Sequence, residues 1–165
     1  KKGEWKGQRW DADIDKKHVG YKFNMNNISA AIGLVQLNYI DRLIEKNKKN
    51  ANIYQNAFNK SNIIKTIKLP NEATSSYWVY TCLFKGGKNK RDLLIEKLIS
   101  EGIAAGLVHI PNHKYSAFED FYTNLPGTKG FSDHQISLPC GWWLTEKNCE
   151  HIASRVKTLS NQIIN

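Results

Sequence analysis

The sequence has few cysteines and no paired cysteine motif. The three thiols are far apart in the chain and none belongs to a CxxC pair: Cys82, Cys140 and Cys149. An odd number of unpaired cysteines argues against a disulfide framework and against a zinc site, and predicts reduced thiols. No apolar run approaches the roughly 20 residues needed to cross a bilayer, and no signal peptide opens the sequence. We therefore expect a cytoplasmic protein with no membrane partner.

Arginine is also scarce, since only four of the 24 basic residues are arginines. The net charge of +9 would suit a nucleic-acid-binding protein, but arginine is the residue preferred for bidentate contacts to phosphates and bases. The lysines are scattered among asparagines, as in residues 45–50, which favours solvated faces. We expect no nucleic-acid partner, although an anionic small molecule would be attracted. A basic binding module for nucleic acid or another acidic partner stays the alternative function.

Several catalytic patterns are missing as well. The chain has no Ser-His-Asp or Cys-His arrangement, and Gly86-Gly87 is typical of a turn rather than of a glycine-rich phosphate loop. A chain of 165 residues with 41% hydrophobic content can bury a core as one domain. Because it begins with Lys-Lys and not with Met, we expect a piece of a longer protein.

The first half of the chain predicts an arm followed by helices. Residues 1–19 show no periodicity and are expected to form a loop or an arm. Apolar residues then recur at helical spacing from about 27 to 59, and Asn26 or Asn27 can cap this region. We expect two helices in this region, and the polar run 46–50 predicts a bend or an exposed turn of helix. The apolar face of residues 28–44 is too wide for a lone surface helix, so we expect it to be exposed here and covered in a larger protein.

The second half predicts a small sheet with helices packed on it. Strands are expected at 63–69, 77–84, 103–110 and 135–138, on the basis of β-branched and aromatic residues. A helix starting at Asn89 and stopping at Gly102 separates two of them, which gives a strand–helix–strand unit. A short helix is expected near 116–122, and Thr145 should cap the last helix, whose apolar stripe is regular. The fold class is therefore α+β.

Four stretches at fixed spacing carry a family resemblance. Residues 20–41 read GYKFNMNNISAAIGLVQLNYID, which is similar to the signature G-Y-x-x-x-M-[STN]-[DN]-I-x-A-A-x-G-L-x-Q-L-x-x-[IL]-D of the DegT/DnrJ/StrS sugar aminotransferases, enzymes that use pyridoxal 5'-phosphate (PLP). Further matches lie at 91–103, at 108–113 and in HQISLPCGWWLT at 134–145. The resemblance covers about residues 20–156.

The resemblance implies both a fold and an activity. The fold would be the small C-terminal domain of a fold-type I aminotransferase, an α+β unit of an α/β class parent. Residues 1–26 would be an arm or linker from the cofactor domain, and 27–165 the small domain with its leading helices. The complete homodimeric enzyme would transfer an amino group from glutamate to a nucleotide-linked keto-sugar in surface polysaccharide biosynthesis. A related dehydratase branch, which replaces the cofactor-linking lysine with histidine, stays open.

The same resemblance implies where the chain would contact cofactor and substrate. In the family the cofactor-linking lysine lies upstream, so we expect no catalytic residue in this chain, no activity of the chain alone and no PLP bound to it. Lys22 and Asn24 would contact cofactor, although many relatives have Asn and Arg there and Lys22 could simply be solvated. Substrate contacts would come from four residues, unless they are ordinary polar loop residues: Arg9, His109, Asn112 and His113. With only His134 as a third candidate ligand, we expect no metal site.

Overall fold

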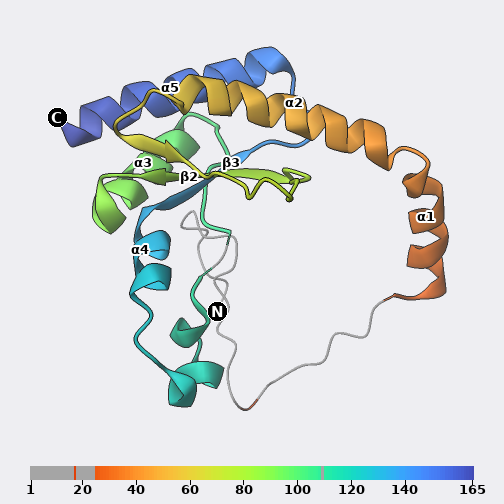
Figure 1. Cartoon of the computed structure of the whole chain (residues 1–165), viewed down its shortest axis with the longest axis horizontal. Coiled ribbons are helices and arrows are strands. Elements are labelled where there is room, and N and C mark those ends of the chain that lie inside the picture. Colours follow the sequence, from red (N-terminus) through yellow and green to blue (C-terminus); the bar gives the residue numbers. More distant parts are fainter. Residues whose placement is uncertain (1–16, 18–24, 109) are drawn as a thin grey trace.

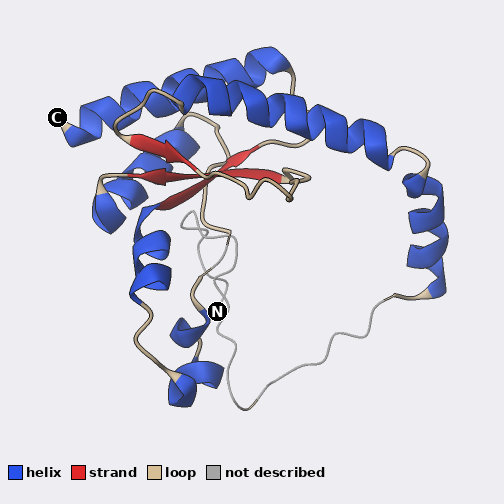
Figure 2. Cartoon of the chain, viewed as in Figure 1, coloured by secondary structure: helices blue, strands red, loops and turns tan. Residues whose placement is uncertain are grey.

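The computed structural model describes residues 17, 25–108 and 110–165. Its three strands form one antiparallel sheet in the order β1-β2-β3, with helices before, between and after them (Figure 2). The elements follow the chain as α1 (Asn27–Leu37), α2 (Ile40–Phe58), β1 (Ile64–Thr66), β2 (Val79–Phe84), α3 (Gly87–Ser100), the 3-10 helices η1 (Asn112–Lys114) and η2 (Ser116–Phe121), α4 (Pro126–His134), β3 (Gln135–Pro139) and α5 (Glu146–Ile164). The predicted α+β class with a small antiparallel sheet is confirmed.

Successive side chains along each strand point to opposite faces of the sheet, so one face packs on the core and the other borders surface cavities. Along β2, Tyr80, Cys82 and Phe84 are buried while their neighbours are half-buried. Cys82 and Ile136 are register partners, so β2 and β3 turn their apolar side chains to the same side. Helices α2 and α5 run side by side over this face, and α3 packs against α5 (Figure 1). Helix α4 and the two 3-10 helices lie on the opposite side of the sheet.

The last helix follows its sequence pattern closely. The Thr145 side chain accepts a hydrogen bond from the backbone N–H of Asn148 at 3.2 Å, and the Asn148 side chain accepts one from the backbone N–H of Thr145 at 3.0 Å. This reciprocal capping box fixes the start of α5, as predicted for Thr145. Four residues of the expected stripe are buried where α5 packs against α2 and α3: Cys149, Ile152, Val156 and Leu159.

The polar run 46–50 forms no bend, and it is a turn of helix that is exposed only in part. The chain breaks at Asn38 and Tyr39 instead, and residues 46–50 lie within α2. Asn47 and Asn50 are both buried, because loop carbonyls accept their amide protons. The Asn47 side chain donates to the carbonyl of Ser76 at 3.0 Å, and that of Asn50 to the carbonyl of Gly141 at 3.0 Å. Polar residues can therefore face the core here.

Three further predictions need correction. Helix α3 begins at Gly87, two residues before the expected start at Asn89. Residues 103–110 form no extended strand in their described part, where bridge pairing is confined to Gly106, which pairs with Ser137, and Leu107; the strand–helix–strand unit is therefore wrong. Helix α4 occupies part of a stretch predicted as loop. The short helix near 116–122 is present as η2, and Gly102 ends α3 with a φ of +79°.

Helix α1 extends away from the sheet at the far end of α2 (Figure 1). Asn26 caps it, because its side chain accepts from the backbone N–H of Ser29 at 2.8 Å. None of its residues is buried, and Ile28 and Leu34 are 75% and 69% exposed. The exposed apolar face expected along residues 28–44 is thus present. No helix in the described part of the chain combines the length and the apolar character needed to span a membrane.

Candidate functional site

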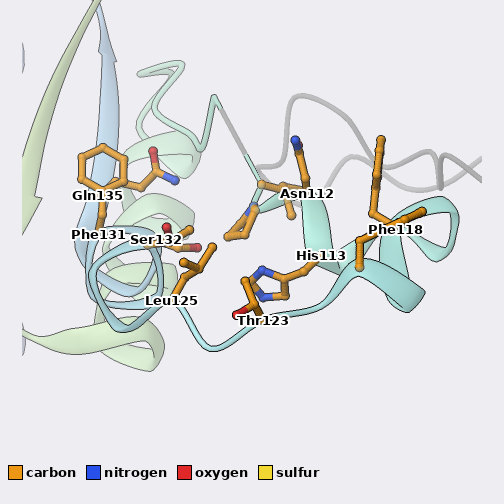
Figure 3. A pocket seen from close by; sticks show the side chains of 12 residues that line it. Asn112, His113, Phe118, Thr123, Leu125, Phe131, Ser132 and Gln135 are labelled. Atoms are coloured by element: carbon orange, nitrogen blue, oxygen red, sulfur yellow. The ribbon is translucent and has the colours of Figure 1, made fainter.

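A cavity of about 440 Å³ lies between the 3-10 helices and the end of α4. Figure 3 shows its two walls facing each other across an open space. One wall consists of α4 and the first residue of β3, and the other of η1 and η2. The lining residues are Ile110, Pro111, Asn112, His113, Phe118, Phe121, Thr123, Leu125, Thr128, Phe131, Ser132 and Gln135.

The structure brings two of the predicted substrate-binding residues to this cavity. Asn112 is exposed at the start of η1, and His113 beside it is half-buried. The His113 ring meets the ring of Tyr122 edge-on, with centroids 5.3 Å apart and planes at 74°. This contact restrains the imidazole at the cavity wall. The other predicted contact residues lie outside the described residues: Arg9, Lys22, Asn24 and His109.

The chemistry of the lining is aromatic and neutral. Of the described residues that line the cavity, none is an aspartate, glutamate, lysine or arginine. Three phenylalanines offer ring faces, while Asn112, Gln135 and several hydroxyl groups offer hydrogen bonds. Apolar walls with a few polar groups are typical of small-molecule sites. Such a lining fits a sugar ring or a nucleobase better than a diphosphate, because it holds no fixed positive charge to pair with phosphate.

The same lining lacks the groups that PLP requires. Its phosphate needs a cation or an array of backbone N–H groups, and its aldehyde needs a lysine. The cavity walls in the described ranges contain no lysine. They therefore do not fit the cofactor, and nothing in the chemistry of this cavity is assigned to PLP.

The wall formed by α4 is held from behind by a buried arginine. Arg91 is only 2% exposed. Its Nη1 donates to the carbonyls of Ser132 at 2.8 Å and Gln135 at 2.9 Å, and its Nε donates to Asp92 Oδ1 at 2.6 Å. Sequence reasoning did not identify this contact. The sequence could have indicated that Arg91 is buried, because its spacing places it on the same face of α3 as the buried Leu94 and Leu98.

The outward side of α4 carries its own local contacts. Lys129 and Asp133 form an ion pair at 2.6 Å, and this hydrogen bond holds the pKa of Asp133 below its usual range. The Nδ1–H of His134 donates to the carbonyl of Gly130 at 2.6 Å, which occupies that ring nitrogen. Among the described residues there is no group of three or more His, Cys, Asp or Glu side chains that could hold a metal ion.

The three cysteines are buried and unpaired in the core. Burial raises the pKa of Cys82 to about 12 and that of Cys140 to about 12 as well. Thiols with raised pKa values are poor nucleophiles and poor metal ligands, because the thiolate is the reactive form. These side chains contribute packing rather than chemistry.

A second, smaller hollow of about 280 Å³ adjoins the cavity along the sheet. Phe131 and Gln135 line both spaces, so they form the boundary between them. The smaller hollow also contacts Tyr77, whose φ of +46° is unusual for a residue with a side chain. The half-exposed Trp78 follows it at the start of β2. One residue of α4 and the first residue of β3 therefore shape two neighbouring spaces.

A sequence model of the DegT/DnrJ/EryC1/StrS aminotransferase family matches residues 3–157. The chain belongs to this family. Among curated relatives, it is 24% identical over 161 residues to the UDP-4-amino-4,6-dideoxy-N-acetyl-beta-L-altrosamine transaminase of Campylobacter jejuni, covering 96% of the chain and 42% of the relative. It is 28% identical over 124 residues to the GDP-perosamine synthase of Escherichia coli O157:H7, covering 73% of the chain and 32% of that protein. The chain thus spans less than half the length of these relatives.

Solved structures of the family resemble this fold. Spr1654 of Streptococcus pneumoniae in its PLP form is 27% identical with a TM-score of 0.79, and the similarity covers 98% of this chain and 42% of that one. PseC of Helicobacter pylori, an aminotransferase involved in the biosynthesis of pseudoaminic acid, is 26% identical with a TM-score of 0.76, covering 88% and 40%. The prediction of a family member with the fold of sugar aminotransferases is confirmed.

Proposed function

We propose that this chain is the C-terminal domain of a PLP-dependent aminotransferase that transfers an amino group from glutamate to a nucleotide-linked keto-sugar. The setting we propose is surface polysaccharide biosynthesis. The observation that carries the proposal is the cavity at η1 and α4, which occurs in a chain whose curated relatives include transaminases of nucleotide sugars. Its neutral aromatic lining suits the uncharged part of such a substrate.

In this proposal the chain binds and orients the substrate. Asn112 and His113 lie at the cavity wall and would hydrogen-bond to sugar hydroxyls. The ring of Phe131 would pack against the apolar face of a sugar or base. We further propose that Arg9 and His109 contact the substrate, and that Lys22 and Asn24 contact the cofactor, as the family resemblance implies.

The remainder of the enzyme would supply the cofactor and its lysine. We propose that residues 1–26 form a linker from the cofactor domain and that 27–165 form the small domain. The uncovered apolar side chains of α1 support this division, because a face this exposed is usually covered by a larger domain or a second subunit. The complete enzyme would act as a homodimer, whereas the chain alone would be inactive and would bind no PLP.

The test uses the full-length protein from the complete reading frame. We expect the absorbance band of enzyme-bound PLP and transfer of the amino group from glutamate to a UDP- or GDP-linked 4-keto-sugar. Asn112→Ala and His113→Ala should each raise KM for the nucleotide sugar about tenfold, which corresponds to about 1.4 kcal/mol of lost binding. Lys114→Ala is the matched control, because Lys114 is exposed on η1 and does not line the cavity. A reading frame with neither Lys nor His at the cofactor-linking position would refute the enzyme assignment.

The alternative, a basic binding module, is supported by the net charge of +9. It predicts retention of the chain on DNA or heparin that falls steeply with salt, since each neutralised phosphate adds to the salt dependence. Weak retention with a shallow dependence would refute this alternative.

A further inference from the structure

We propose that Arg91 is a positioning residue for the substrate cavity: it fixes the α4–β3 wall from behind, so that substrate affinity depends on a side chain that never contacts the substrate. The inference rests on the proposed function, because it concerns how the same cavity recognises its ligand.

The geometry ties Arg91 to the cavity wall at two points. One guanidinium nitrogen donates to the carbonyls of Ser132 and Gln135, and the side chains of both residues line the cavity. Phe131, which directly precedes Ser132 in α4, lines both the cavity and the neighbouring hollow. The arginine itself belongs to α3 and is absent from the lining. It therefore acts on the backbone that carries the lining residues.

The wall depends on such a contact because α4 is intrinsically weak. It has nine residues, of which Gly127 and Gly130 are two. Isolated helices of this length are marginal in water, and glycine lowers helix stability further. The carbonyl of Ser132 lies in the last turn, where no intrahelical N–H can reach it and where a cation is favourable. Arg91 donates a hydrogen bond to this carbonyl and so joins α4 to α3, which is longer at 14 residues.

The burial of the guanidinium shows that the contact is specific. Arg91 is 2% exposed, while the side chain of its ion-pair partner Asp92 remains 45% exposed. A cation removed from water needs hydrogen-bond partners in fixed positions. The two carbonyls supply them, and the planar guanidinium can serve two acceptors at once whereas a lysine ammonium is a flexible point charge.

The experiment compares Arg91→Met with Arg91→Lys in the full-length enzyme. Arg155→Met is the matched control, because Arg155 makes an equally short bidentate ion pair with Glu101, at 2.7 and 2.6 Å, on a part of the fold that does not line the cavity. Two readouts are taken below the unfolding transition of each variant. These are amide hydrogen exchange of residues 126–135 and the separate KM values for the nucleotide sugar and for glutamate.

We expect Arg91→Met to speed exchange in α4 at least tenfold and to raise KM for the nucleotide sugar at least tenfold, with KM for glutamate changed less than twofold. Arg91→Lys should recover part of both effects, and Arg155→Met should show neither. Should Arg91→Met fail to fold, Arg91→Lys carries the same test, with an expected threefold to tenfold rise in the same KM.

Two results would overturn the inference. One is unchanged exchange in α4, which would mean that Arg91 does not hold the wall. The other is faster exchange with an unchanged KM, which would mean that the wall does not determine affinity. Absence of amino transfer by the unmutated enzyme would instead refute the proposed function. Because hydrogen exchange needs no activity, it would still decide whether Arg91 fixes α4.

Discussion

The hydroxyl of Tyr54 gives the sharpest test of how the core is held together. Tyr54 lies on α2 and has no exposed surface. Its hydroxyl donates to the carbonyl of Pro139 at 2.8 Å, at the end of β3. Replacement by phenylalanine removes a single oxygen and leaves the ring stacked on Phe58 and close to Tyr80. The substitution therefore removes the buried hydroxyl, with its hydrogen bond to Pro139 and its contact with the thiol of Cys149.

The magnitude follows from the chemistry of that bond. A hydrogen bond contributes about 1 kcal/mol net, and leaving a buried acceptor unpaired costs about 1–3 kcal/mol. Phenylalanine and tyrosine have similar helix propensities, so α2 itself should not change. We expect Tyr54→Phe to lower the free energy of unfolding by about 1–2 kcal/mol. For a domain of this size that corresponds to a fall in Tm of roughly 2–8 °C.

The assay is urea unfolding of the chain, followed by far-ultraviolet circular dichroism and by fluorescence. The two probes should coincide, and the slope m should match that of the unmutated chain, since the surface exposed on unfolding is the same. Tyr39→Phe is the control, because Tyr39 is 50% exposed between α1 and α2. A loss for Tyr54→Phe no greater than that for Tyr39→Phe would show that the Pro139 carbonyl finds another partner and that the bond contributes nothing.

Three other substitutions test separate contacts. Cys82→Ala should make the free energy of unfolding fall less steeply at high pH. The buried thiol must stay protonated in the folded state, so its contribution to stability is complete below its ordinary pKa of 9.0 and is lost as the pH rises toward about 12. Urea midpoints measured across that pH range would show the difference. Thr145→Ala breaks the capping box with Asn148 and should lower the free energy of unfolding, measured in urea, by about 1 kcal/mol. An almost unchanged free energy would mean that water caps α5 equally well. Gly86→Ala should lower Tm, at a cost of about 1–3 kcal/mol, because an added Cβ would overlap the buried ring of Phe84; an unchanged Tm would mean that the turn can shift.

Local signals in the sequence were sufficient for some elements. Thr145 and Asn148 specify the start of α5 through bonds within four residues, and the stripe behind them has one clear period. Strand β2 was similarly visible from its β-branched and aromatic residues, and its neighbour β3 from a short apolar run. In these cases the interactions that decide the structure lie close together in the chain.

Elements decided by distant partners were predicted wrongly. Asn47 and Asn50 read as a bend or an exposed turn of helix, because their acceptors at Ser76 and Gly141 are 29 and 91 residues away. Residues 103–110 have strand composition, but in their described part bridge pairing is confined to Gly106, which pairs with Ser137, and Leu107. Helix α4 was missed because its glycines disfavour a helix when judged alone. Tertiary contacts overrode local preference in each case.

The candidate site shows the same division. Asn112 and His113 came from a family resemblance, and the structure places both on the cavity. Phe131, Ser132 and Gln135 were not foreseen, since the helix that carries them was not predicted. Arg91 stood in a matched motif, yet its role required knowing that α4 ends beside α3. Sequence reasoning therefore found one wall of the cavity and missed the other.

Helix side chains anchor both ends of β3, which explains how this strand keeps its position beside a cavity. Arg91 of α3 holds the first residue of the strand, through the carbonyl of Gln135. At the other end, Tyr54 and Asn50 of α2 hold the carbonyls of Pro139 and Gly141. Each anchor is a buried helix side chain that donates to a backbone carbonyl, so these bonds fix both ends of a strand that pairs with β2 along its length. On the face of β3 toward the hollows, Gln135 is buried and lines both of them, so this position serves as cavity wall rather than as apolar core.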